Sequence, residues 1–147
     1  MKISDALQNA GYLYFDTAPI IYYVEEHPAY IDKMDAIIAY LKQNSIQVIC
    51  SAMTLTEILP HPIKLGKPLL VKEYRDILLN SREFKIVPIL QKIAESAAQL
   101  RADYNLKTPD ALHIATAIES GCTIFLTNDL GIKRVKGIRV LVLDELD

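Results

Sequence analysis

The sequence lacks several features that mark particular classes of protein. It contains no tryptophan, two cysteines and five glycines in 147 residues. No run approaches the roughly 18 apolar residues of a transmembrane helix. We find no internal repeat, low-complexity tract or Gly/Ser-rich linker. These absences predict a single domain spanning residues 1–147.

The two cysteines, Cys50 and Cys122, have no metal-binding spacing and no C-x-x-C neighbour. We interpret them as buried thiols in a reducing compartment, and a disulfide is the weaker interpretation. The N-terminus runs early into polar residues and does not look like a secretory signal. We therefore expect a cytoplasmic protein.

Excess positive charge is absent too. The net charge is −2 and the pI is about 5.9, which argues against binding nucleic acid by bulk positive charge. A polyanion would need metal ions or a local basic patch. The chain is 51% hydrophobic and 23% charged, so it can build a core and is not expected to be disordered.

Apolar periodicity predicts strands that alternate with helices. Strands are expected at 12–15, 47–50, 85–87, 123–126 and 139–143. Helices are expected at 5–10, 18–26, 30–42, 69–79, 89–104 and 108–120. One more helix, which carries Glu57, is expected to begin after a cap at Ser51 or Thr54. Ser4 and Thr108 are the expected caps of the first and last helices. Residues 60–68 hold three prolines and are predicted to form a loop. The alternation predicts a mainly parallel sheet with helices on both faces.

Four acids should meet at one edge of this sheet. Asp16 follows the first strand, Asp129 follows the fourth, and Glu57 lies about two turns into the helix after the second strand. Asp110 opens the helix that leads into the fourth strand, so it also lies at the carboxyl edge. Like charges this close repel one another unless a hard cation such as Mg²⁺ or Mn²⁺ lies between them.

Each acid alone has a simpler interpretation. Asp16 could cap the following helix, and Asp110 could complement a helix dipole. Glu57 could be a solvated helix residue, and Asp129 a turn residue after a strand. The expected convergence of all four acids favours the metal site.

Four segments around these acids resemble PIN domains, and most closely their VapC-type toxin branch. The segments are Phe15-Asp16-Thr17, Leu55-Thr56-Glu57-Ile58, the ten residues Thr108-Pro109-Asp110-Ala111-Leu112-His113-Ile114-Ala115-Thr116-Ala117, and Leu126-Thr127-Asn128-Asp129. The resemblance covers the chain apart from about residues 1–11, which look like a short N-terminal extension.

The resemblance implies a three-layer α/β/α sandwich with a central, mainly parallel sheet, and a ribonuclease that depends on Mg²⁺ or Mn²⁺. It implies that Asp16, Glu57 and Asp110 are the core acids and Asp129 the fourth. It also implies that Thr127 and Asn128 hold the acids in place without binding the metal ion themselves. PIN toxins usually form homodimers and are silenced by a cognate antitoxin, which makes both features expectations for this chain.

Three further features stand beside the acids. His113 could face the metal, but a buried histidine bonded to backbone is the stronger expectation. Lys133, Arg134 and Lys136 belong to a basic run that could contact an RNA backbone, or could be a solvated loop. The tyrosines near the N-terminus are expected to pack in the core or at an interface, and base stacking is the alternative.

The leading hypothesis is an endoribonuclease that forms the toxin of a toxin–antitoxin pair. The alternatives are an RNA-processing PIN nuclease outside such a system and a PIN-like module that binds RNA or protein without cleaving it. A receiver-like phospho-acceptor domain ranks below these, because it leaves Glu57 and the third segment unexplained.

Overall fold

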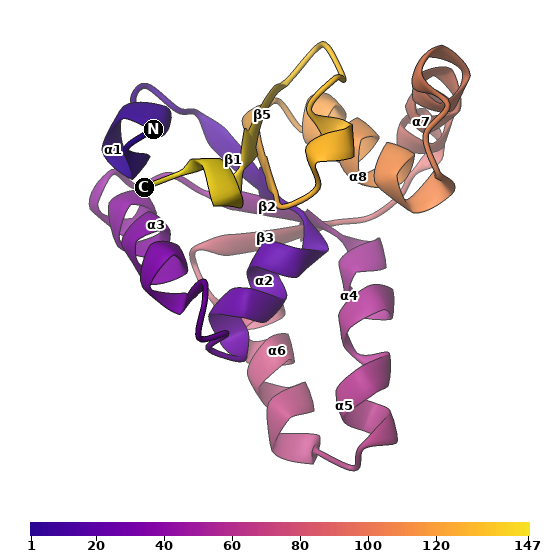
Figure 1. The fold of residues 1–147 in the computed structure, drawn as a ribbon. Helices are drawn as coiled ribbons and strands as arrows, with labels where there is room; N and C mark the ends of the chain where they lie inside the picture. Colours follow the sequence, from indigo (N-terminus) through magenta and orange to yellow (C-terminus); the bar gives the residue numbers. More distant parts are fainter.

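The computed structural model describes residues 1–147 and is built on one parallel sheet (Figure 1). Its five strands lie in the order β3-β2-β1-β4-β5, and every neighbouring pair is parallel. The strands are β1 (Tyr12–Phe15), β2 (Val48–Ser51), β3 (Phe84–Val87), β4 (Cys122–Thr127) and β5 (Arg139–Val142). The predicted strands and the predicted three-layer sandwich are confirmed.

Helices cover both faces of the sheet. One layer contains α1 (Ile3–Ala6), α2 (Thr17–Val24), α3 (Ile31–Gln43) and α6 (Pro68–Asn80), and the other contains α7 (Gln91–Tyr104) and α8 (Thr108–Glu119). The remaining helices are α4 (Ala52–Ile58), α5 (Pro60–Lys64) and the 3₁₀ turns η1 (Leu130–Ile132) and η2 (Leu143–Glu145). Figure 1 shows α5 and α6 meeting at a tip that projects away from the sheet.

Alternation along the strands divides the core in two. In β1, Leu13 and Phe15 belong to the cluster under α2, α3 and α6, whereas Tyr14 belongs to the cluster under α7 and α8. Successive side chains of a strand point to opposite faces, so every second residue faces the same layer. Tyr14 and Asp16 therefore share the side on which α8 packs. This parity determines which helix residues can reach the acids.

The segment 60–68 was wrongly predicted as a loop. Pro60 and Pro62 lie in the first turn of α5, where a proline loses no intrahelical hydrogen bond. Gly66 follows this helix with a φ of +63°, a left-handed conformation that suits glycine. Prolines spaced this way start a short helix as readily as they break one.

Two predicted caps were also wrong. The α8 helix begins with Thr108 itself, and its N-cap residue is Lys107, which makes no side-chain cap hydrogen bond. The first helix is the short α1, whose N-cap is Lys2, so Ser4 lies inside it. By contrast, Ser51 caps α4 by accepting a hydrogen bond from the backbone N–H of Met53.

The N-terminal segment packs on the main body of the fold. Ala6 and Leu7 are buried in the larger core cluster, and the Arg139 side chain donates to the carbonyl oxygen of Ala6 over 2.9 Å. No helix of the structure combines the length and apolar character needed to cross a membrane.

Candidate metal centre at the carboxyl edge

Asp16 lies where β1 ends and caps α2. Its Oδ1 accepts a hydrogen bond from the Thr17 backbone N–H at 2.9 Å, and its Oδ2 accepts one from the Thr127 hydroxyl at 2.7 Å. The simple interpretation as a helix cap therefore holds, but it uses only one of the two oxygens. The other oxygen ties the acid to the end of β4.

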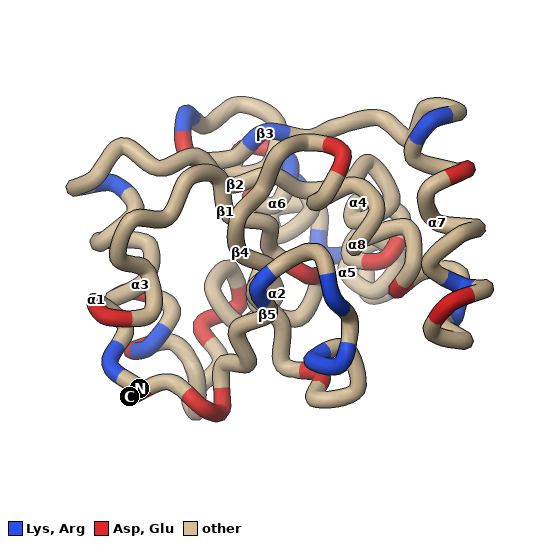
Figure 2. The backbone as a smooth tube through the Cα atoms, turned by 90° about the horizontal axis from the view of Figure 1, so that it is seen from above, with Lys and Arg blue, Asp and Glu red and all other residues tan.

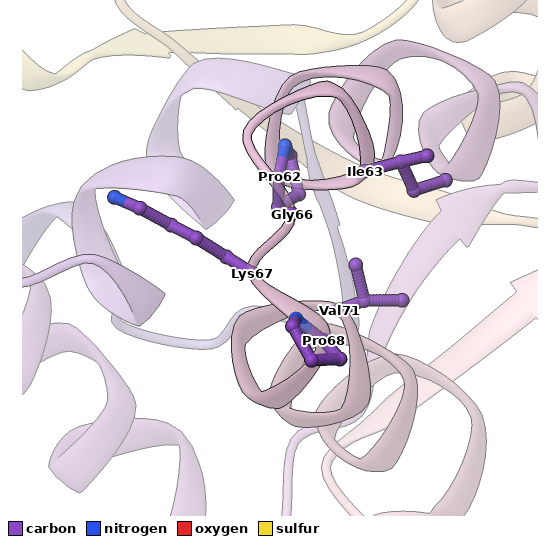
Figure 3. Close-up of a pocket in the computed structure, with 6 residues that line it drawn as sticks. All are labelled: Pro62, Ile63, Gly66, Lys67, Pro68 and Val71. Carbon is purple, nitrogen blue, oxygen red and sulfur yellow. The ribbon is translucent and has the colours of Figure 1, made fainter.

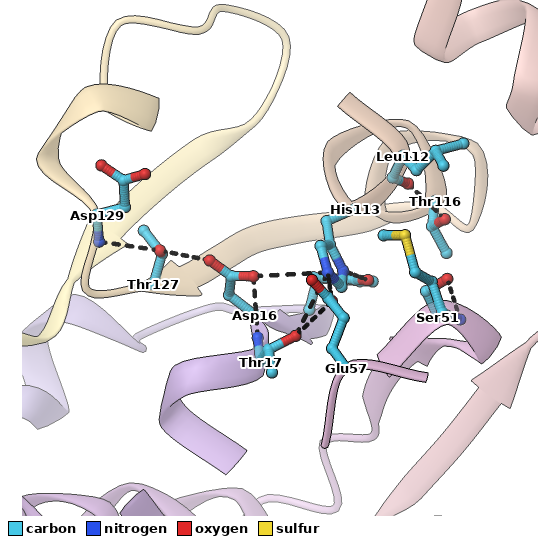
Figure 4. Close-up of polar contacts among 11 residues, drawn as sticks. Asp16, Thr17, Ser51, Glu57, Leu112, His113, Thr116, Thr127 and Asp129 are labelled. Carbon is cyan, nitrogen blue, oxygen red and sulfur yellow. Dashed lines mark hydrogen bonds and ion pairs between the residues drawn. The ribbon is translucent and has the colours of Figure 1, made fainter. Parts of the chain in front are cut away.

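Thr127 connects two of the acids (Figure 4). It is fully buried, and its Oγ1 accepts the backbone N–H of Asp129 at 3.1 Å while donating to Asp16. Asp129 in turn caps η1, since its Oδ1 accepts the Gly131 N–H at 2.8 Å. The predicted support from Thr127 thus has a direct physical form, although its functional role stays a prediction.

Asp110 stands in the first turn of α8 and is half-buried. Burial raises the pKa of this carboxyl, and the negative charges of Asp16 and Asp129 raise it further. The three carboxyl groups therefore lie within electrostatic reach of one another.

Glu57 reaches the same edge from α4 but is tied to other residues. Its Oε1 accepts the Thr17 hydroxyl at 2.9 Å and lies 2.6 Å from His113 Nε2. The hydrogen bond with His113 lowers the pKa of Glu57, so this carboxyl is held in its ionised form. Figure 4 shows the His113 ring joined by dashed lines to both the Asp16 and the Glu57 side chains.

The donor chemistry fits a hard divalent cation. No Lys or Arg side chain forms an ion pair with any of the four acids, and burial and the neighbouring acids outweigh the opposing effects of His113 and Lys107 on the Asp110 pKa. Carboxylate oxygens are the donors that Mg²⁺ and Mn²⁺ prefer. The side chains do not converge fully, because no three His, Cys, Asp or Glu residues close around a point that could hold an ion. Binding would require small side-chain rotations.

His113 is buried at 2% exposure, but its partners are side chains and not backbone. Its Nδ1 lies 2.5 Å from the Tyr14 hydroxyl, and its Nε2 contacts Glu57. The expected backbone partner was therefore wrong. Tyr14 was missed as a site residue, yet two spacings could have indicated it. Tyr14 and Asp16 are two apart on a strand, and Asp110 and His113 are three apart on a helix.

Asn128 has different partners from those of Thr127. Its side-chain amide donates to the Tyr30 hydroxyl at 2.9 Å, and its Oδ1 accepts the Asp144 N–H at 3.2 Å. It forms no hydrogen bond with any of the four acids. Tyr30 also stacks on Tyr22, with ring centroids 4.2 Å apart. Asn128 thus joins the β4 end to α3 and the C-terminal segment, and its predicted support of the acids stays a prediction.

The predicted basic run lies in the loop between η1 and β5 (Figure 2). Lys133 is paired with Glu145, since its Nζ is 2.8 Å from both carboxylate oxygens. Arg134 and Lys136 are exposed, and their side chains form no hydrogen bond or ion pair. These two are therefore free to meet an external anion, while Lys133 is partly neutralised.

A separate hollow lies at the tip formed by α5 and α6. It has a volume of about 310 Å³ and contains none of the four acids; Figure 3 shows its lining residues, which are Pro62, Ile63, Gly66, Lys67, Pro68 and Val71. Large apolar side chains are exposed around it, with Ile63 at 60% and Leu69 at 81%. An exposed apolar patch of this kind is typical of a surface that contacts another protein.

Solved structures with the same fold come from toxin–antitoxin systems. A chain of VapBC2 from Rickettsia felis bound to a promoter DNA fragment is 20% identical, with a TM-score of 0.73 and coverage of 88% of this chain and 97% of that one. A chain of DNA-bound VapBC from Salmonella typhimurium is 20% identical, with a TM-score of 0.71 and coverage of 90% and 98%.

A third similar structure is VapC20 from Mycobacterium tuberculosis, described as a toxin that cleaves the sarcin–ricin loop. It is 14% identical, with a TM-score of 0.61 and coverage of 77% of this chain and 86% of that one. At these identities the likeness concerns the fold alone. No curated protein gives a significant sequence match.

The family model of the PIN domain matches residues 13–138, which include all four acids. The match excludes α1 and the C-terminal residues that contact it. The chain belongs to the PIN domain family.

Proposed function

We propose that this protein is a divalent-metal-dependent endoribonuclease. The observation that carries the proposal is the gathering of Asp16, Asp110 and Asp129 at the carboxyl edge of a PIN-family sheet with no Lys or Arg side chain paired to them. Glu57 lies beside them, held by Thr17 and His113. We assign these four acids as the groups that hold Mg²⁺ or Mn²⁺, directly or through water.

The chemistry divides between the ion and the chain. A bound Mg²⁺ or Mn²⁺ supplies positive charge that lowers the pKa of a water molecule and stabilises the oxygens of a phosphodiester under attack. Asp16 keeps its orientation because both of its oxygens are hydrogen-bonded, to Thr17 and Thr127. Asp110 and Asp129 complete the negative pocket, and Glu57 adds an ionised carboxylate from α4.

RNA is the proposed substrate. The free Arg134 and Lys136 side chains lie in the loop that follows Asp129, where they can contact phosphates on either side of a cleaved bond. The description of the Mycobacterium tuberculosis protein as a sarcin–ricin loop cleaving toxin supports RNA within the same fold. A net charge of −2 makes this local basic loop and the metal the main attractions for a polyanion.

We further propose that the protein is a cytoplasmic toxin that forms a homodimer and is silenced by an antitoxin. The VapBC structures of Rickettsia felis and Salmonella typhimurium support this assignment. The exposed apolar tip around Ile63 and Leu69 offers a surface for a protein partner. Induced expression in bacterial cells should arrest growth, and Asp110→Asn should relieve the arrest. Normal growth with the wild type would contradict the toxin assignment, and arrest by both forms would show that toxicity does not come from this site.

The nuclease is tested by incubating the protein with a mixed-sequence single-stranded RNA and a structured ribosomal RNA fragment. Cleavage should occur in Mn²⁺ or Mg²⁺, stop in EDTA and be lost in Asp110→Asn. Asp76→Asn is the matched control, because Asp76 is paired with Lys72 on the exposed surface of α6. Metal uptake without cleavage of either RNA would favour a binding module. Cleavage that persists in EDTA would contradict the mechanism.

A further inference from the structure

We infer that Tyr14 and His113 are positioning residues that lock the Glu57 carboxylate in place for the metal ion. The inference rests on the proposed function, since it concerns the same site. It is argued from two consecutive contacts: a buried one from the Tyr14 hydroxyl to His113 Nδ1 over 2.5 Å, and a part-buried one from His113 Nε2 to Glu57 Oε1 over 2.6 Å. Neither residue was among the predicted ligands, and neither needs to touch the ion.

The proton on the imidazole is fixed by its partners. A carboxylate can only accept hydrogen bonds, and Glu57 Oε1 lies 2.6 Å from Nε2 and accepts the Thr17 hydroxyl at 2.9 Å. Nε2 must therefore carry the hydrogen that it donates to Oε1. In the neutral ring Nδ1 is then an acceptor, and the Tyr14 hydroxyl is the donor that faces it.

Tyr14 is built to keep this donor in place. Tyr14 lies on the face of β1 that packs against α8, which holds its hydroxyl 2.5 Å from Nδ1. Its ring stacks on Phe125 with centroids 5.0 Å apart and meets His113 edge-on at 5.7 Å. The side chain is fully buried between the sheet and α8. A fixed phenol thus selects one tautomer of the histidine, and the histidine then sets the carboxylate.

The contacts leave one oxygen of Glu57 available. Thr17 and His113 both bond to Oε1, and Oε2 has no hydrogen-bond partner in the protein. His113 Nε2 also lies 3.9 Å from Asp16 Oδ1, so the anchored carboxylate stands beside the first of the clustered acids. Groups that orient metal ligands in this way typically contribute about 10- to 100-fold in metal affinity.

The test is Mn²⁺ binding by calorimetry to the full chain, with a pair of amide variants. His113→Gln places an amide N–H about where Nε2 lies, whereas His113→Asn carries the same amide on a side chain one methylene shorter, which cannot reach Glu57. Both variants lose the imidazole. His113→Gln should bind Mn²⁺ nearly as tightly as wild type, and His113→Asn should bind about tenfold more weakly. Thermal unfolding of both variants checks that they fold.

Two further measurements do not depend on these variants. Nitrogen NMR of the metal-free wild type should show the His113 proton on Nε2 and a bare Nδ1. Tyr14→Phe, which keeps the stacked ring, should weaken this preference and lower Mn²⁺ affinity. Glu57→Gln should lower Mn²⁺ affinity at least as much as His113→Asn.

The outcomes distinguish the positioning role of Tyr14 and His113 from the proposed nuclease function. If wild type binds Mn²⁺ but the two amide variants bind equally, or NMR places the proton on Nδ1 alone, the positioning role is overturned while the proposed function stands. If wild type takes up no Mn²⁺, the proposed function fails and this inference fails with it. A loss in His113→Asn with retention in His113→Gln supports the inference.

Discussion

The carboxyl edge and the α5–α6 tip differ in polarity and burial: the edge has buried polar side chains, and the tip has exposed apolar ones. At the edge, buried polar side chains hold one another, as Thr127 does for Asp16 and Tyr14 does for His113. At the tip, apolar side chains such as Leu69 at 81% exposure face water. Buried polar networks fix geometry, which chemistry needs. Exposed apolar surface favours association with another molecule. The comparison teaches that the proposed site of reaction and the apolar hollow at the tip are separate surfaces.

The largest effect should come from removing one charge at the edge. Asp16→Asn keeps the shape and the helix cap but deletes a negative charge beside Asp110. Cleavage of RNA should fall at least about 100-fold, because charge stabilisation by the metal contributes several kcal/mol. Gel-based cleavage assays measure the loss, and an unchanged circular dichroism spectrum shows that the fold survives. Normal cleavage by the variant would remove Asp16 from the site.

Metal binding itself should stabilise the edge. At a free Mn²⁺ concentration of about 100 times its Kd, the folded state should gain about 2.7 kcal/mol, since the unfolded chain lacks the site. Asp110→Asn should lose most of this gain and, without metal, unfold no more easily than wild type, because burial and its acidic neighbours already disfavour the Asp110 charge. Denaturant unfolding with and without Mn²⁺ provides the comparison. Equal stabilisation of both proteins would locate the ion elsewhere.

Loss of the link between two acids should have a smaller effect. Thr127→Val keeps the volume but leaves Asp16 Oδ2 without its donor and the Asp129 N–H without its acceptor. Stability should fall by about 1–3 kcal/mol, the cost of unpaired buried polar groups. Mn²⁺ affinity should fall about tenfold. Thr127→Ser, which restores the hydroxyl, should recover most of the affinity; if it does not, the hydrogen bond is not the cause.

The basic loop should contribute mainly through salt-dependent binding. Arg134→Ala and Lys136→Ala should each reduce the slope of log affinity for single-stranded RNA against log salt by about 0.7. Lys133→Ala should change the slope less, because Glu145 already pairs with Lys133. Binding is measured with a metal-site variant that cannot cleave. Equal effects of all three variants would show that the ion pair opens on RNA binding.

A substitution at the tip should weaken association with other molecules and leave RNA cleavage unchanged. Leu69→Asp removes apolar surface from an exposed site, so the stability of the monomer should change by no more than about 0.5 kcal/mol and the site chemistry should be unaffected. Self-association or binding of a protein partner should weaken instead, as measured by light scattering after size-exclusion chromatography. A loss of RNA cleavage by a well-folded monomer would break the separation between the two surfaces.

The sequence predicts the sheet well, for reasons that are local. Short apolar runs such as 12–15 form the strands, and strand ends bring Asp16 and Asp129 to one edge. Prediction from sequence fails where a short motif is compatible with two backbone conformations. The prolines at 60 and 62 are compatible with a loop or with the first turn of a helix, and packing of α5 against α6 decides.

The partners of side chains are the hardest feature to predict. The spacings of Tyr14 to Asp16 and of Asp110 to His113 indicate shared faces, but the hydrogen bonds of His113 to Tyr14 and Glu57 depend on how α8 lies across β1. The same holds for Lys133, whose partner Glu145 is close in sequence but is brought near by the turn of β5 and η2. These details emerge only from tertiary structure.

The most direct test of the central claim is a crystal structure of the protein soaked with Mn²⁺, with the ion located by its anomalous scattering. The account predicts a peak between Asp16, Asp110 and Asp129, with Glu57 Oε2 turned toward it directly or through water. A peak confined to other acids, or none at the carboxyl edge at a Mn²⁺ concentration that supports RNA cleavage, would contradict it.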